Sequence, residues 1–201
     1  MIENILFLIA SFFAAVVATI AGFGSSTLLI PVAVFFMDVK TAVFVVACFH
    51  LFNNTFKIRL FWKSIRWEIF LLFGLPSILF AFTGAYLISV IPVDIIGRIL
   101  GIFLISFSVF SLIKPKFGLK ENKTSAMLGG SASGLLAGLI GLGEAIRSAF
   151  LVAFNLPKKM YVATSAIIAF VIDLTRIPTY FVTRLVQGVA KSFKNSKSLS
   201  F

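Results

Sequence analysis

Acidic residues, cysteine and histidine are scarce in this sequence. Of 201 residues, 7 are Asp or Glu against 18 Lys or Arg, and Cys48 and His50 are the single representatives of their types. One cysteine excludes an intrachain disulfide scaffold. His50 has no second histidine or carboxylate at ligand spacing, so we expect no metal site and an imidazole that is packed or faces a cavity. The sequence also has no phosphate loop and no nucleophile elbow, so we expect neither an enzyme nor a cofactor.

Apolar residues dominate the chain instead. They make up 60% of it, charged residues make up 12%, and the mean hydropathy is +1.08, which lies outside the range of soluble domains. The basic excess would suit nucleic acid only on a solvated face, whereas these Lys and Arg residues separate long apolar runs. We therefore expect an all-α, polytopic helical membrane protein with no nucleic-acid partner.

Six apolar runs are long enough to be membrane segments, at about 20 residues per crossing. They cover residues 4–36, 41–57, 67–91, 93–113, 126–155 and 160–183. Basic stretches lie at 57–66, at 114–124 and from 184 onward. If every run crosses once, these three stretches share one face, which is then cytoplasmic, and Lys40, Lys158 and Lys159 lie on the opposite face.

Two of the runs are too long for one straight crossing. Runs 4–36 and 126–155 would measure about 45 Å or more as single helices. Each contains a glycine pair, Gly22 with Gly24 and Gly141 with Gly143. We therefore predict two broken or re-entrant helices, whose free backbone groups must be satisfied by protein or by a water-filled cavity.

The two glycine pairs belong to a predicted internal repeat. A shift of 119 positions aligns Gly22 with Gly141, Gly24 with Gly143, Lys40 with Lys159, Asn54 with Asp173, and Lys57 with Arg176. We predict a first transmembrane repeat at 1–113, an incomplete second repeat at 126–190 that lacks about two helices, and a polar basic tail at 191–201. Whether the copies are parallel or inverted depends on how often each broken segment crosses.

Paired broken helices indicate a central site for an anion. Their N-termini present free N–H groups and the positive end of the helix dipole. Ser25 and Ser26 follow the first glycine pair and can add hydroxyl donors. The alternative is that these small residues only allow close helix packing.

Ionisable residues inside apolar runs are the second indication of a site, because a charge at membrane depth is costly unless it faces a cavity or a partner. Glu144 and Arg147 are three positions apart, as are Asp173 and Arg176, so each pair shares a helix face. Each can be a structural ion pair or part of the site, and we favour Arg176 as functional. Thr164 and Ser165 can line the same cavity or bond their own backbone.

The sequence resembles the TauE/SafE family of sulfite-exporter-like membrane proteins. The resemblance rests on Gly-Phe-Gly-Ser-Ser-Thr-Leu-Leu-Ile-Pro at 22–31, on the second copy at 134–143, and on Ala163-Thr164-Ser165. It implies two related helical halves that move small anions such as sulfite or organosulfonates across the inner membrane. It also implies that the glycine pairs and the polar residues Asn54, Thr164, Ser165 and Asp173 line the pathway. Glu144 stands where the family usually has small residues, and if unpaired it would repel an anion.

The sequence therefore predicts a multi-pass anion transporter of the bacterial inner membrane. The expected substrate-binding residues are Gly22, Gly24, Ser25, Ser26, Asn54, Gly141, Gly143, Glu144, Arg147, Thr164, Ser165, Asp173 and Arg176. The expected partners are a small anion and the lipid bilayer, with further copies of the chain as an option. The alternative is a truncated, non-transporting membrane protein or a partner-dependent subunit of the same fold, which Glu144 and the short second repeat favour.

Overall fold

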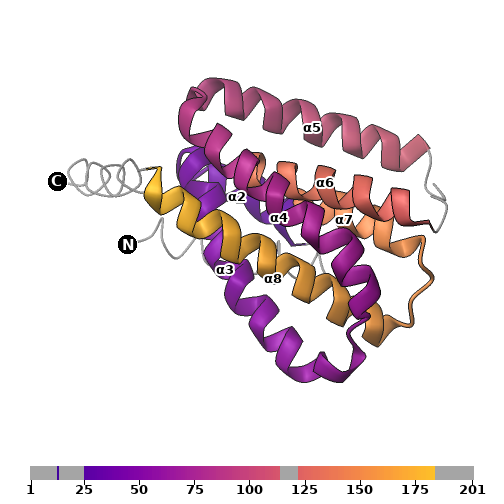
Figure 1. Cartoon of the computed structure of the whole chain (residues 1–201). Coiled ribbons are helices and arrows are strands. Elements are labelled where there is room, and N and C mark those ends of the chain that lie inside the picture. Colours follow the sequence, from indigo (N-terminus) through magenta and orange to yellow (C-terminus); the bar gives the residue numbers. More distant parts are fainter. Residues whose placement is uncertain (1–12, 14–24, 114–121, 184–201) are drawn as a thin grey trace.

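A computed structural model describes residues 13, 25–113 and 122–183, and every regular element in this part of the chain is a helix (Figure 1). Its elements are α2 (Ser26–Val34), α3 (Val39–Phe61), the 3-10 turn η1 (Trp62–Ser64), α4 (Trp67–Val90), α5 (Val93–Ile113), α6 (Lys123–Ile140), α7 (Gly143–Val152) and α8 (Lys158–Val182). The predicted all-α class is confirmed. Gly22, Gly24 and the tail at 191–201 lie outside the described residues.

Four of these helices have the length and apolar composition needed to cross a membrane. Among the described residues they are α3 with η1, α4, α5 and α8, which correspond to the predicted runs 41–57, 67–91, 93–113 and 160–183. Helix α3 begins where the Asp38 side chain accepts hydrogen bonds from the N–H groups of Lys40 and Thr41, each at 3.1 Å. This is an ordinary N-terminal cap, which satisfies donors that the helix itself cannot pair.

Helices α4 and α6 pack backbone to backbone through small residues. A Cβ atom at Gly130, Gly134 or Gly138 of α6 would collide with a carbonyl oxygen of α4, at Phe73, Ser77 and Ala81 respectively. The Ser77 hydroxyl also donates to the Gly130 carbonyl at 3.0 Å. Small residues four positions apart let two membrane helices approach this closely, and van der Waals packing stabilises the contact. Because these contacts advance in the same direction along both sequences, α4 and α6 run parallel.

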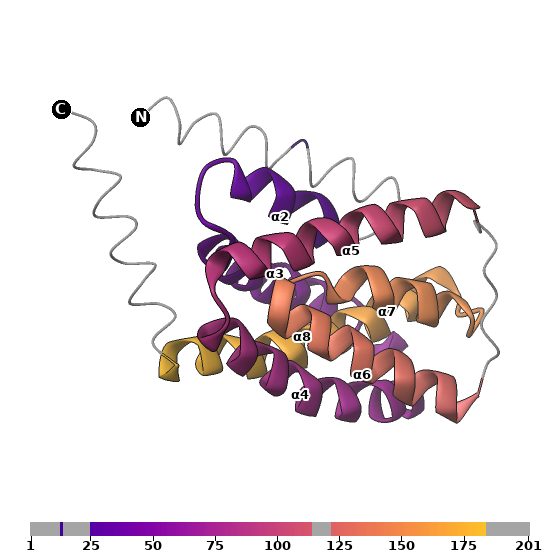
Figure 2. The same cartoon turned by 90° about the horizontal axis from the view of Figure 1, so that it is seen from above.

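The run 126–155 is broken at its glycine pair and folds back on itself. Helix α6 ends at Gly141, which has φ of 75°, a left-handed conformation that glycine adopts without a Cβ penalty. Helix α7 then returns alongside α6, because Gly143 lies against Ser133 and Ala137 while Phe150 lies against Gly129 (Figure 2). The predicted break is confirmed for this segment, and it is a re-entrant hairpin.

The hairpin changes the predicted distribution of charge. Because α7 ends near the start of α6, helix α8 begins at the same end of the bundle as α4, where the Arg66 N–H donates to the Thr164 hydroxyl at 3.0 Å. Lys158 and Lys159 therefore lie at the end that holds Lys123 and the basic stretch 57–66. Their predicted place on the opposite face was wrong, because run 126–155 does not cross once as the prediction assumed.

Helices α3 and α8 are antiparallel neighbours. Ile58, near the end of α3, packs with Ala163 and Ile167 near the start of α8, and Phe44 meets Tyr180 at the opposite end. The first residues of the two helices, Val39 and Lys158, are 158 − 39 = 119 positions apart, the same shift that aligns the glycine pairs. The repeat remains a prediction, and if α3 and α8 are copies, the two halves are inverted.

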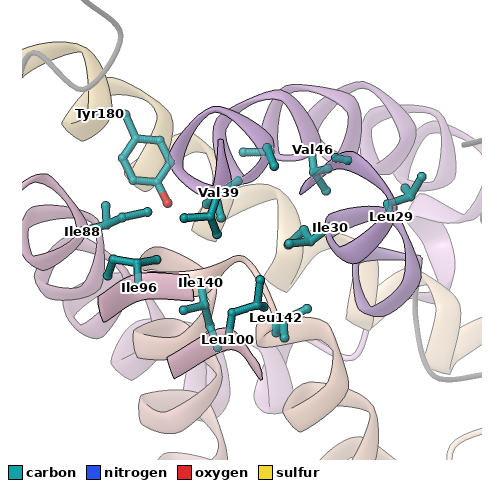
Figure 3. Close-up of a cluster of buried hydrophobic side chains, with 14 of the residues drawn as sticks. Leu29, Ile30, Val39, Val46, Ile88, Ile96, Leu100, Ile140, Leu142 and Tyr180 are labelled. Atoms are coloured by element: carbon teal, nitrogen blue, oxygen red, sulfur yellow. The ribbon is translucent and has the colours of Figure 1, made fainter. Parts of the chain in front are cut away.

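The largest apolar cluster joins α2 to the break in run 126–155. Ile30 of α2 points toward Ile140 and Leu142 at the break, and Leu29 belongs to the same cluster (Figure 3). The cluster continues through α3, through the turn between α4 and α5, and to Tyr180 of α8. This packing fixes the start of α2 beside the start of α7.

Candidate functional site

The N-termini of two short helices meet at the centre of the bundle. The Glu144 carboxylate, in the first turn of α7, lies at the start of α2, where its Oε2 accepts from the Ser26 N–H at 3.2 Å and from the Ser26 hydroxyl at 3.1 Å. The Ser25 hydroxyl approaches the same oxygen at 3.5 Å. Helix α2 has no side-chain cap of its own. A negative oxygen therefore sits where the free N–H groups and the dipole of α2 favour one.

Two further cationic or titratable side chains face this carboxylate. His50, near the middle of α3 and only 5% exposed, has Nδ1 at 4.0 Å from Oε2 of Glu144, and its Nε2 lies 3.2 Å from the Ser25 hydroxyl. Arg147 has Nη2 at 3.9 Å from Oε1 of Glu144, while its Nε donates to the Ser165 hydroxyl at 3.0 Å. Glu144 is therefore paired, although its contacts with His50 and Arg147 are loose.

A small cavity adjoins this cluster. Its walls come from α2, α3, the α6–α7 break and α8, and its lining residues are Ser26, His50, Ala137, Gly141, Gly143, Glu144, Arg147, Ala169, Ile172, Asp173 and Arg176. His50 and Asp173 stand well inside membrane-length helices. The cavity consequently lies at membrane depth rather than at an interface.

Arg176 and Asp173 form a tight ion pair on the α8 wall of the cavity. Oδ1 of Asp173 is 2.7 Å from Nη2 and 2.8 Å from Nε of Arg176. Nη1 of Arg176 donates to the Ala137 carbonyl at 2.6 Å, and the Tyr180 hydroxyl donates to the Gly138 carbonyl at 2.6 Å. Both carbonyls belong to the last turn of α6, where the Ala137 carbonyl also accepts from the Gly141 N–H at 3.1 Å. Arg176 thus places its charge at the negative end of α6.

The predicted site residues fall into three groups. Ser26, Gly141, Gly143, Glu144, Arg147, Asp173 and Arg176 line the cavity, and Ser25 and Ser165 contact residues that line it. Thr164 instead accepts from the Arg66 N–H at the start of α4, and Asn54 is buried outside the lining with no hydrogen-bond partner for Nδ2 among the described residues. Gly22 and Gly24 lie outside the described residues.

Sequence reasoning did not include His50 among the site residues. A single histidine in an apolar run carries no spacing signal, because its neighbours in the site, Ser25 and Glu144, lie 25 and 94 positions away (144 − 50 = 94). The available signal was the cost of a polar imidazole at membrane depth, which favours a cavity-facing position.

A bundle of membrane-length helices with a polar cavity at membrane depth, between the N-termini of two short helices, is typical of membrane transporters. The family model described as sulfite exporter TauE/SafE matches residues 7–191, and the chain belongs to this family. It is similar to a probable membrane transporter protein of Methanocaldococcus jannaschii, with 28% identity over 157 residues, 70% of this chain. The matched region spans 58% of that relative's length. No solved structure matches the chain.

Proposed function

We propose that this protein binds a small oxyanion, such as sulfite or a sulfonate, in the cavity between α2 and α7 and moves it across the inner membrane of a bacterial cell. The observation that carries the proposal is the oxygen of Glu144 at the start of α2, where the Ser26 N–H and hydroxyl converge on it at 3.2 and 3.1 Å. A sulfite or sulfonate oxygen accepts hydrogen bonds from the same donors that hold a carboxylate oxygen.

Arg147 is the proposed electrostatic partner of the substrate. Its side chain is buried, it lines the cavity, and its guanidinium is 3.9 Å from the nearest carboxylate oxygen. Because this contact is longer than a hydrogen bond, Nη2 can donate to an incoming anion while Nε stays bonded to the Ser165 hydroxyl. Arg176, by contrast, is bound by Asp173 and by the Ala137 carbonyl, so its role is to stabilise the broken end of α6 beside the substrate.

The test is flux of radiolabelled sulfite or methanesulfonate into proteoliposomes that contain the purified chain. Arg147→Gln should lower the initial rate by about tenfold or more, because a buried charged partner contributes roughly 1.4 kcal/mol or more to holding an anion. Arg98→Gln is the control, since Arg98 is exposed on α5. Flux of both anions at the rate of empty liposomes would overturn the proposal, and an Arg147→Gln rate equal to wild type would remove Arg147 from it.

A second candidate is a non-transporting or partner-dependent membrane protein of the same fold. One observation favours it, which is that Glu144 already satisfies the donors at the start of α2. This candidate predicts that the proteoliposomes carry neither anion, so the same experiment decides between the two.

A further inference from the structure

The oxyanion site contains a negative oxygen that belongs to the protein. Three donor contacts converge on Oε2 of Glu144, from the Ser26 N–H, the Ser26 hydroxyl and the Ser25 hydroxyl. The donors come from the start of α2, whereas Glu144 comes from α7, 118 positions further along the chain. A carboxylate from α7 thus occupies the donor site at the start of α2, and it also caps that helix.

An incoming oxyanion would need the donors that Glu144 holds. The other cation of the cavity, Arg176, directs Nε and Nη2 to Asp173 and Nη1 to the Ala137 carbonyl. Among the described side chains at the cavity, the donors that remain for a ligand are those around Glu144, namely Ser25, Ser26, His50 and Arg147. Two negative groups within hydrogen-bond reach of one donor set repel each other strongly at membrane depth. The substrate and the carboxylate therefore exclude each other.

Glu144 is held loosely enough to leave. Its side chain is 18% exposed, and its carboxylate oxygens are 4.0 Å from Nδ1 of His50 and 3.9 Å from Nη2 of Arg147. The Asp173–Arg176 pair, in comparison, is 3–4% exposed with a contact of 2.7 Å. The glutamate side chain has several rotatable bonds, so it can swing out of the donor set without movement of the α7 backbone.

We propose that Glu144 is a built-in occupant of the oxyanion site, which a substrate anion must displace. The inference rests on the proposed function, because it assigns to this side chain the control of affinity and selectivity at the same site. An anion that cannot outcompete the tethered carboxylate is rejected, and when no substrate is present the site stays filled and α2 stays capped.

The test compares anion binding to the purified full chain and to variants at this position. Thermal unfolding is followed by fluorescence while sodium methanesulfonate, sodium sulfite or sodium formate is titrated, with sodium chloride at equal ionic strength as the reference. A ligand that binds only the folded state raises Tm in a saturable way. Formate is a free carboxylate and replaces the group that Glu144→Ala removes. Glu68→Ala is the matched control, since Glu68 is exposed in the first turn of α4.

Glu144→Ala should bind methanesulfonate and formate with half-saturation at about tenfold lower concentration than wild type, because the tethered competitor is gone. Glu144→Gln should fall between the two, because its amide oxygen still accepts from Ser26 without a charge. Glu68→Ala should match wild type. If Glu144→Ala does not fold, Glu144→Gln serves instead, and it should reach half-saturation at a lower anion concentration than wild type.

The outcomes separate this inference from the proposed function. Equal affinity of wild type, Glu144→Gln and Glu144→Ala for methanesulfonate would overturn the inference and leave the oxyanion site standing. Saturable binding of formate to Glu144→Ala, with no binding of sulfite or sulfonate to any variant, would overturn the proposed function and support Glu144 as the occupant. Absence of a saturable shift with every anion would overturn both.

Discussion

At the scale of single residues, the charges inside the bundle have separate tasks. Glu144 and Arg147 face the cavity with long contacts, while Asp173 and Arg176 form a short pair that also holds the open end of α6. Sequence spacing made the two pairs look equivalent, since both are three positions apart. The difference comes from the partners that only the folded chain supplies, Ser26 for Glu144 and the Ala137 carbonyl for Arg176.

The Asp173–Arg176 pair gives a prediction for stability. Arg176→Met should lower the free energy of unfolding by about 3 kcal/mol, because it leaves a buried carboxylate uncompensated and removes a hydrogen bond to the Ala137 carbonyl. Unfolding of the detergent-solubilised protein measures this change, with Arg98→Met as the exposed control. Adding Asp173→Asn to Arg176→Met should restore part of the loss, since it removes the isolated charge. A double variant no more stable than Arg176→Met would contradict the claim that the isolated Asp173 charge destabilises the protein.

At the scale of elements, the contact between α4 and α6 holds the hairpin in place. The glycines at 130, 134 and 138 allow two backbones to touch, and the α6–α7 break then presents Gly143 and Glu144 to the cavity. The starts of α2 and α7 are brought together by the apolar cluster around Ile30, Ile140 and Leu142. Glycine therefore serves close packing at 130, 134 and 138 and the helix break at Gly141.

A pair of glycine substitutions tests this packing. Gly134→Ala should destabilise the protein by about 1–3 kcal/mol, because the added Cβ collides with the Ser77 carbonyl oxygen and forces the helices apart. Gly101→Ala in α5 has nothing within 4 Å of its Cβ, so it should be neutral or slightly stabilising through helix propensity. Thermal unfolding of both variants measures the difference. Equal stability of the two would mean that α4 and α6 are not in backbone contact.

At the scale of the whole molecule, the hairpin decides which ends of the helices share a side of the membrane. Lys63 in η1, Lys123 at the start of α6 and Lys158 at the start of α8 lie at one end of the bundle, whereas Asp94 at the start of α5 lies at the other. The positive-inside rule predicts that the first end is cytoplasmic. The integral, multi-pass character of the protein agrees with this arrangement and with its family.

Cysteine labelling in intact cells tests the arrangement. In a Cys48→Ala background, Lys63→Cys and Lys158→Cys should both resist a membrane-impermeant maleimide, and Asp94→Cys should react with it, because the first two lie on the cytoplasmic side. Cells made permeable should label all three, which controls for exposure. Reaction of Lys158→Cys together with Asp94→Cys in intact cells would restore the simple alternation of crossings and contradict the hairpin.

The sequence by itself determined the membrane class, the four long apolar helices, the break at Gly141 and the family. These follow from composition, run length and a residue that tolerates positive φ, which are properties of short stretches of chain. It did not determine that α7 turns back, because a glycine break permits a helix to continue or to reverse, and only the packing of Gly143 and Phe150 against α6 selects reversal. The partner of Glu144 was likewise decided by tertiary structure alone, since Ser26 and Glu144 are 118 positions apart and meet only after α2 and α7 have packed.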